Sequence, residues 1–517
     1  MSNNEATGKN EKIISVILGI YIISIGFGLP LVVRDFYFDI LIFKYYYYCF
    51  CTISMIVIVL GYALINQIKD KSIIIKGFRI ETLVGKLTIV DLFVLLYWFI
   101  AIISTITSDY FYEAFWGNEG RYTGLFLITW YVLSYFCVSR FWKFKSWYID
   151  IMLFAGILVC IFGITDYFNL DIFSFKAQMM PEQKPIFTST IGNINTYTAY
   201  VGIISAIGTV LFTAEKKMSK AIWYYICMII SFFAIIMGVS DNAYLSLGAL
   251  FVFLPIYLFK NKFGVKKYLI ILATFFTVTQ CIDWINNSFR DKVLGIDSAF
   301  DLVISFSALH YLVLLLWIMV FVLHIFDLKR SAEIKNYGNK LVTLWLVLIA
   351  AGAIGILFAL YDCNIAGNAD RYSFASNYLL FNDNWGTHRG FIWRNAMECF
   401  LNLPLWKKII GYGPETFGIL LLRKTVNNPY NEIFDSAHNE YLHTLITVGI
   451  FGLISYVSLL LFFIKNCLKN KSNNAYVVAV VFGVICYSVQ AFVNLNLPIV
   501  TPIFWLLIGI GSVRSID

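Results

Sequence analysis

The chain has 517 residues, of which 60% are hydrophobic, 18% are aromatic and only 14% are charged. Its mean hydropathy is positive, so the composition excludes an ordinary soluble globular protein. The net charge of +8 does not indicate nucleic-acid binding. The cations lie in short segments between apolar runs, where they orient a membrane protein.

The apolar runs have the length that a transmembrane helix needs, about 20 residues. The first run, Ile13 to Val33, lacks a small-residue cleavage site, so we interpret it as a retained span. Similar runs recur along the chain and predict an all-α, polytopic bundle of about fourteen transmembrane helices, a single domain over residues 1–517. The predicted spans start near Ile13, Tyr46, Leu87, Thr123, Tyr148, Asn193, Ile222, Ala243, Tyr268, Leu302, Leu341, Tyr441, Ala475 and Pro498.

Basic residues predict the orientation of these spans. Lys and Arg occur in every second polar segment, from Lys9 and Lys12 before the first span to Arg514 after the last. By the positive-inside rule, both termini are cytoplasmic. A further group of cations lies in one long outer segment, residues 361–440, where we expect the chemistry. This group is Arg371, Arg389, Arg394, Lys407, Lys408, Arg423 and Lys424.

The ten cysteines lie mostly within apolar runs, and none has the spacing of a metal site. The sequence therefore predicts neither a metal nor a cofactor. Cys363 and Cys399 fall in the outer segment, and spacing alone does not decide whether they form a disulfide. Asp91 and His310 lie within apolar runs, where a hydrogen bond to a neighbouring helix and a role in proton coupling are about equally favoured.

The outer segment contains three recognisable pieces. Arg389–Asn402 has helical apolar spacing and ends before Pro404, which predicts a short interfacial helix. A turn follows at Gly411–Pro414. Asp435–Leu442 then leads into an apolar run, so His438 is expected at the water end of a span.

These residue types suit the transfer of a sugar from a polyprenyl diphosphate. Arginine binds phosphate oxygens bidentately and stays charged, and histidine can draw a proton from a sugar hydroxyl. Arg389 and His438 are therefore the candidate pair. Taken singly, an arginine at a membrane surface is more often a headgroup contact, and a histidine there is usually interfacial.

In their order, the pieces resemble the O-antigen ligase and O-antigen polymerase superfamily. The resemblance covers residues 117–452. It rests on Gly117–Gly124 (GNEGRYTG), Gly192–Asn195 (GNIN), Arg389–Trp393 (RGFIW), Leu403–Pro404, Gly411–Gly413 (GYG), Ala437–Leu442 (AHNEYL) and Gly449–Gly452 (GIFG). One feature departs from the ligases, which often have a Ser-Arg pair at the outer end of a mid-chain span, because Ser240-Asp241-Asn242 stands there instead.

The resemblance implies an inverting, metal-independent glycosyltransferase. Its donor would be a glycan on undecaprenyl diphosphate, and its acceptor a second glycan or a lipid. It implies that His438 activates the acceptor hydroxyl, while Arg389, and with it Arg121 or Arg394, holds the diphosphate. Asn439, Asn193 and Asn195 are candidates for substrate contacts, although a polar residue that begins a span more often caps the helix.

Several alternatives stay open. The acceptor separates a polymerase from a ligase, and the missing Ser-Arg pair favours the polymerase slightly. A flippase for lipid-linked oligosaccharides predicts two related halves and charges at mid-depth in the spans, and the sequence has neither in a convincing form. A scaffold in a polysaccharide assembly complex is the third reading. The expected location is a bacterial cytoplasmic membrane, with the active site outside and with membrane lipids and polysaccharide assembly proteins as partners.

Overall fold

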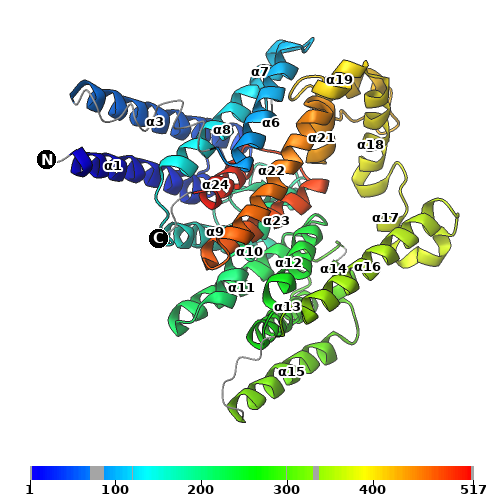
Figure 1. The fold of residues 1–517 in the computed structure, drawn as a ribbon. Helices are drawn as coiled ribbons and strands as arrows, with labels where there is room; N and C mark the ends of the chain where they lie inside the picture. The colour runs from blue at the N-terminus through cyan, green and yellow to red at the C-terminus, as the bar shows by residue number, and fades with distance from the viewer. Residues whose placement is uncertain (1–2, 70–86, 119, 299, 330–336, 514–517) are drawn as a thin grey trace.

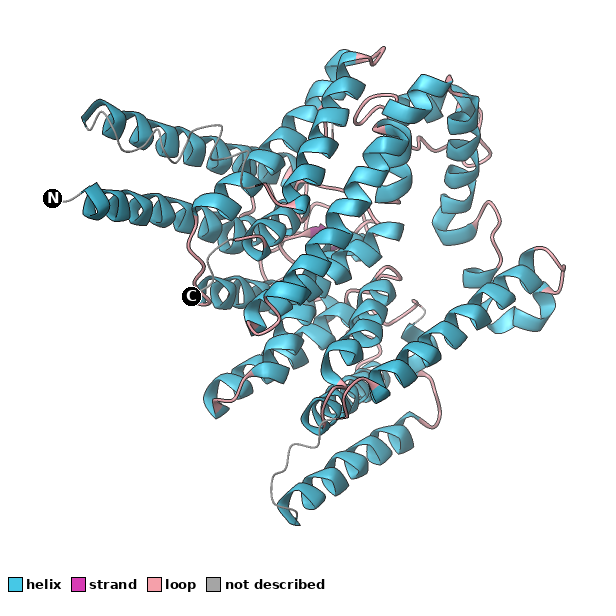
Figure 2. Ribbon diagram, in the orientation of Figure 1, coloured by secondary structure: helices cyan, strands magenta, loops and turns pink. Residues whose placement is uncertain are grey.

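A computed structural model of the chain describes residues 3–69, 87–118, 120–298, 300–329 and 337–513. Helices make up most of this part and strands almost none of it, which confirms the predicted all-α class (Figure 2). Its one sheet is a short antiparallel pair, β1 (Phe187–Thr188) and β2 (Gly192–Asn193), in which Phe187 lies opposite Asn193. Several of the cytoplasmic cations that predict the orientation lie outside the described residues, namely Lys71, Lys76, Arg79, Lys86, Arg330, Lys335 and Arg514.

The number of predicted spans agrees with the described helices. Eleven of them are long and apolar enough to cross a membrane, and three shorter apolar helices complete the set. The long ones are α1 to α2 (Asn10–Leu31), α3 (Ile40–Lys69), α6 (Ile89–Ile106), α9 (Trp147–Tyr167), α10 (Ile194–Ala214), α11 (Met218–Met237), α13 (Lys262–Ser288), α15 (Leu309–Lys329), α16 (Lys340–Asn364), α22 (Gly449–Asn470) and α23 (Ala475–Gln490). The shorter ones are α8 (Leu125–Phe141), α12 (Ala243–Leu258) and α24 (Thr501–Gly511).

Two predicted boundaries are wrong by about two turns. The span expected from Tyr441 begins at Gly449, because Gly449 has a positive φ of 80° and separates α21 (Glu440–Thr447) from α22. The span expected from Leu302 begins at Leu309, after a separate short helix, α14 (Phe300–Ile304). His438 therefore precedes a short helix and not a span.

Helix α10 lies at the centre of the bundle, against α9, α11, α12 and α23 (Figure 1). In the most apolar stretch of α10, 94% of the residues are buried inside the bundle. Because lipid gives no hydrophobic drive for helix association, close approach depends on small residues. A methyl group on Gly156 or Gly163 of α9 would collide with Ile204 or Tyr197 of α10, so these glycines set the distance between the two helices.

Helices α15 and α16 lie at one edge of the bundle (Figure 1). In their most apolar stretches, only 17% of the residues of α15 and 6% of those of α16 are buried. Such apolar surfaces suit the acyl chains of a bilayer. His310, near the start of α15, is exposed and its ring lies against Tyr311, so it does not form the interhelical hydrogen bond that its sequence context allowed.

The outer segment folds around an apolar cluster of its own. It contains η3 (Ala369–Ala375), α17 (Ser376–Leu379), α18 (Trp385–Asn402), α19 (Leu405–Ile410), α20 (Phe417–Thr425) and α21. Phe391, Phe400, Phe417 and Phe434 form much of the cluster. The thiols of Cys363 and Cys399 are both free in this structure.

Asp91 has a structural position at the start of α6. Its carboxylate accepts hydrogen bonds from Thr88 and Tyr135 and pairs with Arg140 of α8. Thr88 and Asp91 also form a capping box. The side chains of Asp91 and Arg140 are only 2% and 6% exposed, so this pair fastens α6 to α8.

We expect Asp91→Ala to destabilise the protein by about 3–5 kcal/mol, because it removes the buried carboxylate that pairs with Arg140 and bonds Tyr135 and Thr88. The measurement is thermal unfolding of the purified protein in detergent. The control is Glu11→Ala, which removes the exposed ion pair with Lys143 and should cost less than about 1 kcal/mol. Equal losses in the two variants would contradict this account.

Candidate functional site

Helix α18 carries the Arg-x-x-x-Trp motif. Gly386, Thr387 and His388 have positive φ values, so the regular right-handed helix begins at Arg389, as predicted. Arg389 and Trp393 are four residues apart and lie on one face of the helix. The indole of Trp393 donates a 2.7 Å hydrogen bond to the carbonyl of Ala437, which brings this face against the His438 loop.

The Gly-Tyr-Gly turn docks on the junction of α21 and α22. The amides of Tyr412 and Gly413 donate to the carbonyls of Ile446 and Thr447, each at 3.0 Å. Gly411 has a φ of 95°, and a Cβ there would collide with the Thr447 carbonyl. Only glycine permits both the backbone conformation and the close contact.

His438 lies in a tight turn immediately before α21. Its φ of 46° is unusual for a residue other than glycine, and its amide donates to Ser436 Oγ at 3.2 Å. Asn439 caps α21, because its Oδ1 accepts hydrogen bonds from the amides of Tyr441 and Leu442. Asn439 therefore orients the turn that carries the histidine, and its predicted contact with the substrate stays a prediction.

The imidazole of His438 is held in its neutral form. Burial and, after it, the positive charges of Arg389 and Arg121 lower the pKa of His438 to about 4, against an opposing effect of Asp435. The structure thus brings His438, Arg389 and Arg121 within electrostatic reach of one another, as the motifs predicted. A neutral imidazole at neutral pH is free to accept a proton.

Arg389 is partly buried and has an amide, not a carboxylate, as its partner. Its Nη1 donates to Asn242 Oδ1 at 3.3 Å. Burial lowers the pKa of the Arg389 guanidinium, and the charge of Asp241 opposes this shift. Among the described residues, no carboxylate forms an ion pair with Arg389, so its charge is available to an anion.

This contact bears on the missing Ser-Arg pair. The segment Ser240-Asp241-Asn242 lacks an arginine of its own, yet the Arg389 guanidinium reaches Asn242 from α18. On its other side, Ser240 Oγ donates to Asn195 Oδ1 at 2.7 Å. A guanidinium from elsewhere in the chain therefore stands beside the segment where the ligase pattern has one.

Arg121 and Arg394, the other two predicted diphosphate ligands, both have acidic partners. Arg121 Nε and Nη2 donate to the two oxygens of Asp435 at 3.0 and 2.5 Å. Burial raises the pKa of Asp435, but the hydrogen bonds and charge of Arg121 outweigh it and lower the pKa overall. Arg394 is exposed and pairs with Asp383 at 2.7 Å, on a different side of α18 from Arg389.

Asn193 and Asn195 have structural partners in this structure. Asn193 Oδ1 accepts the amide of Asn195 and caps α10. Asn195 Oδ1 accepts from Ser240, and its carbonyl accepts from Asn494. The hydrogen bond of Asn195 holds the start of α10 against the Ser240–Asn242 segment that Arg389 contacts. The predicted substrate contacts of Asn193 and Asn195 stay predictions.

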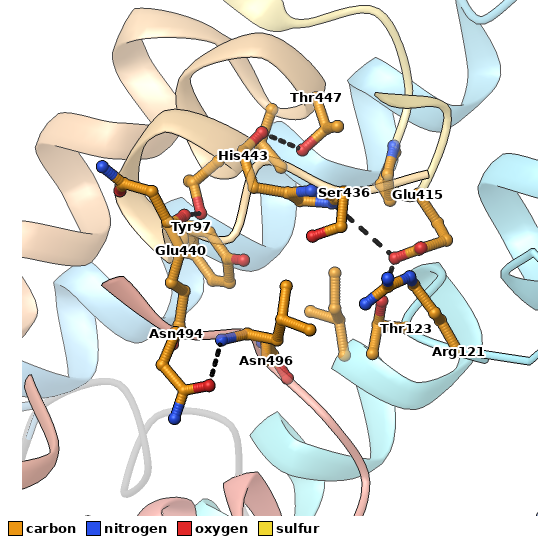
Figure 3. A pocket seen from close by; sticks show the side chains of 16 residues that line it. Tyr97, Arg121, Thr123, Glu415, Ser436, Glu440, His443, Thr447, Asn494 and Asn496 are labelled. Carbon is orange, nitrogen blue, oxygen red and sulfur yellow. Dashed lines mark hydrogen bonds and ion pairs between the residues drawn. The ribbon is translucent and has the colours of Figure 1, made fainter. Parts of the chain in front are cut away.

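A small polar cavity of about 40 Å³ lies beside Arg121 (Figure 3). Figure 3 shows Arg121, Thr123 and Glu415 on one side of it and Glu440 and Tyr97 on the other. A water needs about 10–15 Å³ on this measure, so the cavity has room for a few waters but not for a sugar. The polar residues that line it are Tyr97, Arg121, Thr123, Glu415, Ser436, Asn439, Glu440, His443, Thr444, Thr447, Asn494 and Asn496.

Sequence reasoning missed Glu415, Glu440 and His443. Glu415 accepts a hydrogen bond from Thr123, and its Oε2 lies 3.7 Å from His443 Nε2. Burial lowers the pKa of His443. Glu440 and His443 come directly after His438 in the sequence, and this proximity could have indicated that they lie near the site. Nothing in the sequence indicated that Glu415 would join them.

The described residues contain no group of three or more His, Cys, Asp or Glu side chains arranged for a metal ion. A metal-independent reaction stays a prediction.

Residues 293–457 match a family model described as O-antigen ligase. This match confirms the resemblance to the O-antigen ligase superfamily for the part that contains Arg389, the Gly-Tyr-Gly turn and His438. The motifs at Gly117–Gly124 and Gly192–Asn195 lie outside the match, so the resemblance there stays a prediction. No curated protein sequence gives a significant match to the chain.

The neutral state of His438 predicts a pH-dependent stability. Between pH 6.5 and about 4, the unfolded chain binds a proton at this residue and the folded chain does not. Stability therefore falls as the pH drops through this range, by up to about 3 kcal/mol from His438. The free energy of unfolding, measured with urea in detergent, should fall less with decreasing pH in His438→Gln than in the wild type. Parallel pH curves for the two proteins would rule out a lowered pKa for His438.

Proposed function

We propose that the chain, whose residues 293–457 match a family model described as O-antigen ligase, transfers or polymerises glycans carried on undecaprenyl diphosphate. The reaction takes place at the outer face of a bacterial cytoplasmic membrane. The observation that carries this proposal is the neutral His438, held close to the unneutralised guanidinium of Arg389. A base and a phosphate-binding cation are the two groups that the reaction requires.

His438 acts as the general base. Its imidazole takes the proton from the acceptor hydroxyl while the hydroxyl oxygen attacks the anomeric carbon of the donor. The diphosphate leaves from the opposite side, so the configuration inverts. The tight turn held by Ser436, Asn439 and the Trp393–Ala437 hydrogen bond fixes the imidazole before the substrate arrives, which lowers the entropic cost of the step.

Arg389 binds the departing diphosphate. A guanidinium without a carboxylate partner can give two parallel hydrogen bonds to phosphate oxygens. Its position at the first turn of α18 also places the positive end of that helix near the anion. Arg121 contributes charge to the same region, while its bidentate bond to Asp435 holds its loop in place. No metal is needed for this charge stabilisation.

The acceptor is either a second lipid-linked repeat unit, as in a polymerase, or a different lipid or polymer, as in a ligase. The absence of a Ser-Arg pair at Ser240–Asn242 was the main sequence argument against a ligase. The guanidinium of Arg389 beside Asn242 removes that argument. The two activities differ in product, because a polymerase lengthens the lipid-linked chain and a ligase empties the lipid carrier in one transfer.

We expect His438→Ala to lower transfer by about 10²–10⁴-fold, the usual contribution of a general base. Surface glycan should disappear, and the lipid-linked unit should accumulate on the outer leaflet, at normal protein levels in the membrane. Accumulation on the inner leaflet would instead support a flippase. Unchanged glycan output in His438→Ala would contradict the transferase proposal.

Arg389→Lys and Arg394→Lys form a matched pair on one helix. Loss of a preorganised donor to the developing charge costs about 10²–10³-fold, so Arg389→Lys should lower transfer at least a hundredfold. Arg394 has an exposed ion pair worth less than about 1 kcal/mol, so Arg394→Lys should change the rate less than about fivefold. The measurement is conversion of lipid-linked donor in isolated membranes, and equal losses would contradict the assignment.

A further inference from the structure

A second cavity, which we call the α14–α17 cavity, lies between the outer segment and the chain that follows α13. Its volume is about 180 Å³, compared with about 40 Å³ for the cavity beside Arg121. A water needs about 10–15 Å³ on this measure, so the α14–α17 cavity has room for one sugar ring with its hydroxyl groups. Every residue that lines it but one has a polar side chain. Asp297, Ser298 and Asp301 come from the chain around the start of α14, and Ser376, Asn377 and Tyr378 come from α17.

The α17 wall of this cavity is held in place by the end of α16. The carboxylate of Asp362 accepts a 3.0 Å hydrogen bond from Tyr372 of η3. The side-chain amide of Asn364 donates a 2.7 Å hydrogen bond to the carbonyl of Leu379, the last residue of α17. A ligand would therefore meet a wall that is already ordered, which lowers the entropic cost of binding.

The opposite wall contains a buried hydroxyl group without a donor. Ser298 is only 8% exposed, and its Oγ accepts no hydrogen bond from a described residue. The hydroxyl of Tyr244 lies close to it but donates its own proton to Asp241 Oδ1 at 3.0 Å. A buried polar group without a partner is costly. Because Ser298 lines the cavity, a ligand there can supply the missing donor.

The charge of the lining selects the kind of ligand. Asp297 and Asp301 both line the cavity, and neither forms an ion pair among the described residues. Ionised carboxylates accept hydrogen bonds and donate none, so they repel phosphates and acidic sugars and favour a ligand with many O–H or N–H groups. The polar lining is also a poor environment for an acyl chain. Tyr378 is 38% exposed and offers an apolar ring face beside these acceptors. A neutral or amino sugar has the matching chemistry.

The cavity lies next to the guanidinium that we assign to the diphosphate. The hydroxyl of Tyr378 makes a long hydrogen bond, at 3.5 Å, to Asp241 Oδ1. The next residue, Asn242, accepts a hydrogen bond from Arg389, and the charge of Asp241 acts on the same guanidinium. The segment Ser240–Asn242 therefore contacts both the cavity wall and Arg389. A glycan attached to a diphosphate at Arg389 would have the cavity within its reach.

We propose that the α14–α17 cavity is a glycan subsite that binds one neutral or amino sugar of the lipid-linked substrate while Arg389 holds a diphosphate. This inference rests on the proposed transferase function. Sugar hydroxyls donate to the carboxylates of Asp297 and Asp301 and to Ser298 Oγ. The subsite determines which glycan is bound, and the reacting groups remain His438 and Arg389. The sugar belongs to the donor or to a lipid-linked acceptor.

The first test measures binding without turnover. The probe is the oligosaccharide released by mild acid from the lipid-linked unit that accumulates in His438→Ala cells. Saturation-transfer NMR with purified protein, in a detergent without a sugar headgroup, should show that this oligosaccharide binds. Asp301→Asn should weaken binding about tenfold, through the loss of a hydrogen bond to a charged group. The control Asp291→Asn alters an exposed carboxylate of the same segment that does not line the cavity, and its Kd should match the wild type.

The second test fills the cavity. Asn377 is exposed at its rim, so Asn377→Trp should block the subsite without disturbing a core. We expect KM for the lipid-linked substrate to rise about tenfold or more, with kcat changed less than about threefold, because the lost contacts are equal in the ground and transition states. The control Asn402→Trp places the same side chain at an exposed position of α18 away from the cavity and should leave KM unchanged.

Undecaprenyl diphosphate without a glycan separates the subsite from the diphosphate site. It should inhibit Asn377→Trp and the wild type equally, because it does not reach the cavity. Weaker inhibition of the variant would show that the substitution disturbs the diphosphate site and would contradict the assignment. With a separate acceptor, a higher KM for the donor alone assigns the sugar to the donor, and a higher KM for the acceptor alone assigns it to the acceptor.

The outcomes distinguish this inference from the function on which it rests. If His438→Ala cells accumulate the lipid-linked unit but its oligosaccharide binds wild type, Asp301→Asn and Asn377→Trp equally or not at all, the subsite is wrong and the transferase function stands. If His438→Ala leaves transfer intact and no unit accumulates, the proposed function fails, and the subsite fails with it.

Discussion

The backbone contact between the Gly411–Gly413 turn and the junction of α21 and α22 holds the polar site against the apolar bundle. Side chains at Gly411 or Gly449 would collide with carbonyl groups across this contact. Ser104 of α6 and Ser108, just after the end of α6, donate to the carbonyls of Thr447 and Tyr412, respectively. Because the amides and carbonyls satisfy one another, the irregular backbone is tolerated at the boundary of a membrane protein.

That contact fixes the direction of α21 and hence the groups at its start. His438 and Asn439 precede the helix, and Glu440 is its first residue. The same turn leads into Glu415, so the contact also brings Glu415 to the cavity. The placement of the candidate base, its cap and the nearby carboxylates therefore follows from one glycine-dependent interaction.

Charge in this region is arranged by pairing. Arg121, Arg394, Lys407 and Lys424 each have a carboxylate partner, while Arg389 has the amide of Asn242. Paired cations contribute to the local field but offer less to a new anion. The guanidinium without a carboxylate partner and the neutral imidazole are complementary in the proposed reaction, in which negative charge develops on the diphosphate and positive charge on the base.

Much of the architecture could be predicted from periodicity. The set of apolar helices and the regular helix from Arg389 to Asn402 follow from patterns local to each segment. The errors occurred where one residue changed the backbone. Gly449 ended a helix that apolar content alone would have continued. Asp91, in contrast, is buried as expected, and its contacts with Tyr135 and Arg140 of α8 match the structural reading of the two that its context left open.

The sequence by itself determined the membrane class and the residues that carry the family resemblance, because hydropathy and motif order are properties of neighbouring residues. Only the tertiary structure decided that Arg389 keeps a charge without a carboxylate partner, that Arg121 is paired with Asp435, and that Glu440 shares a cavity with Glu415. These facts join segments that lie up to about 300 positions apart, as in the Arg121–Asp435 pair. The physical reason is that a charge interacts through space with whatever the packing brings near it, and sequence spacing does not encode that distance.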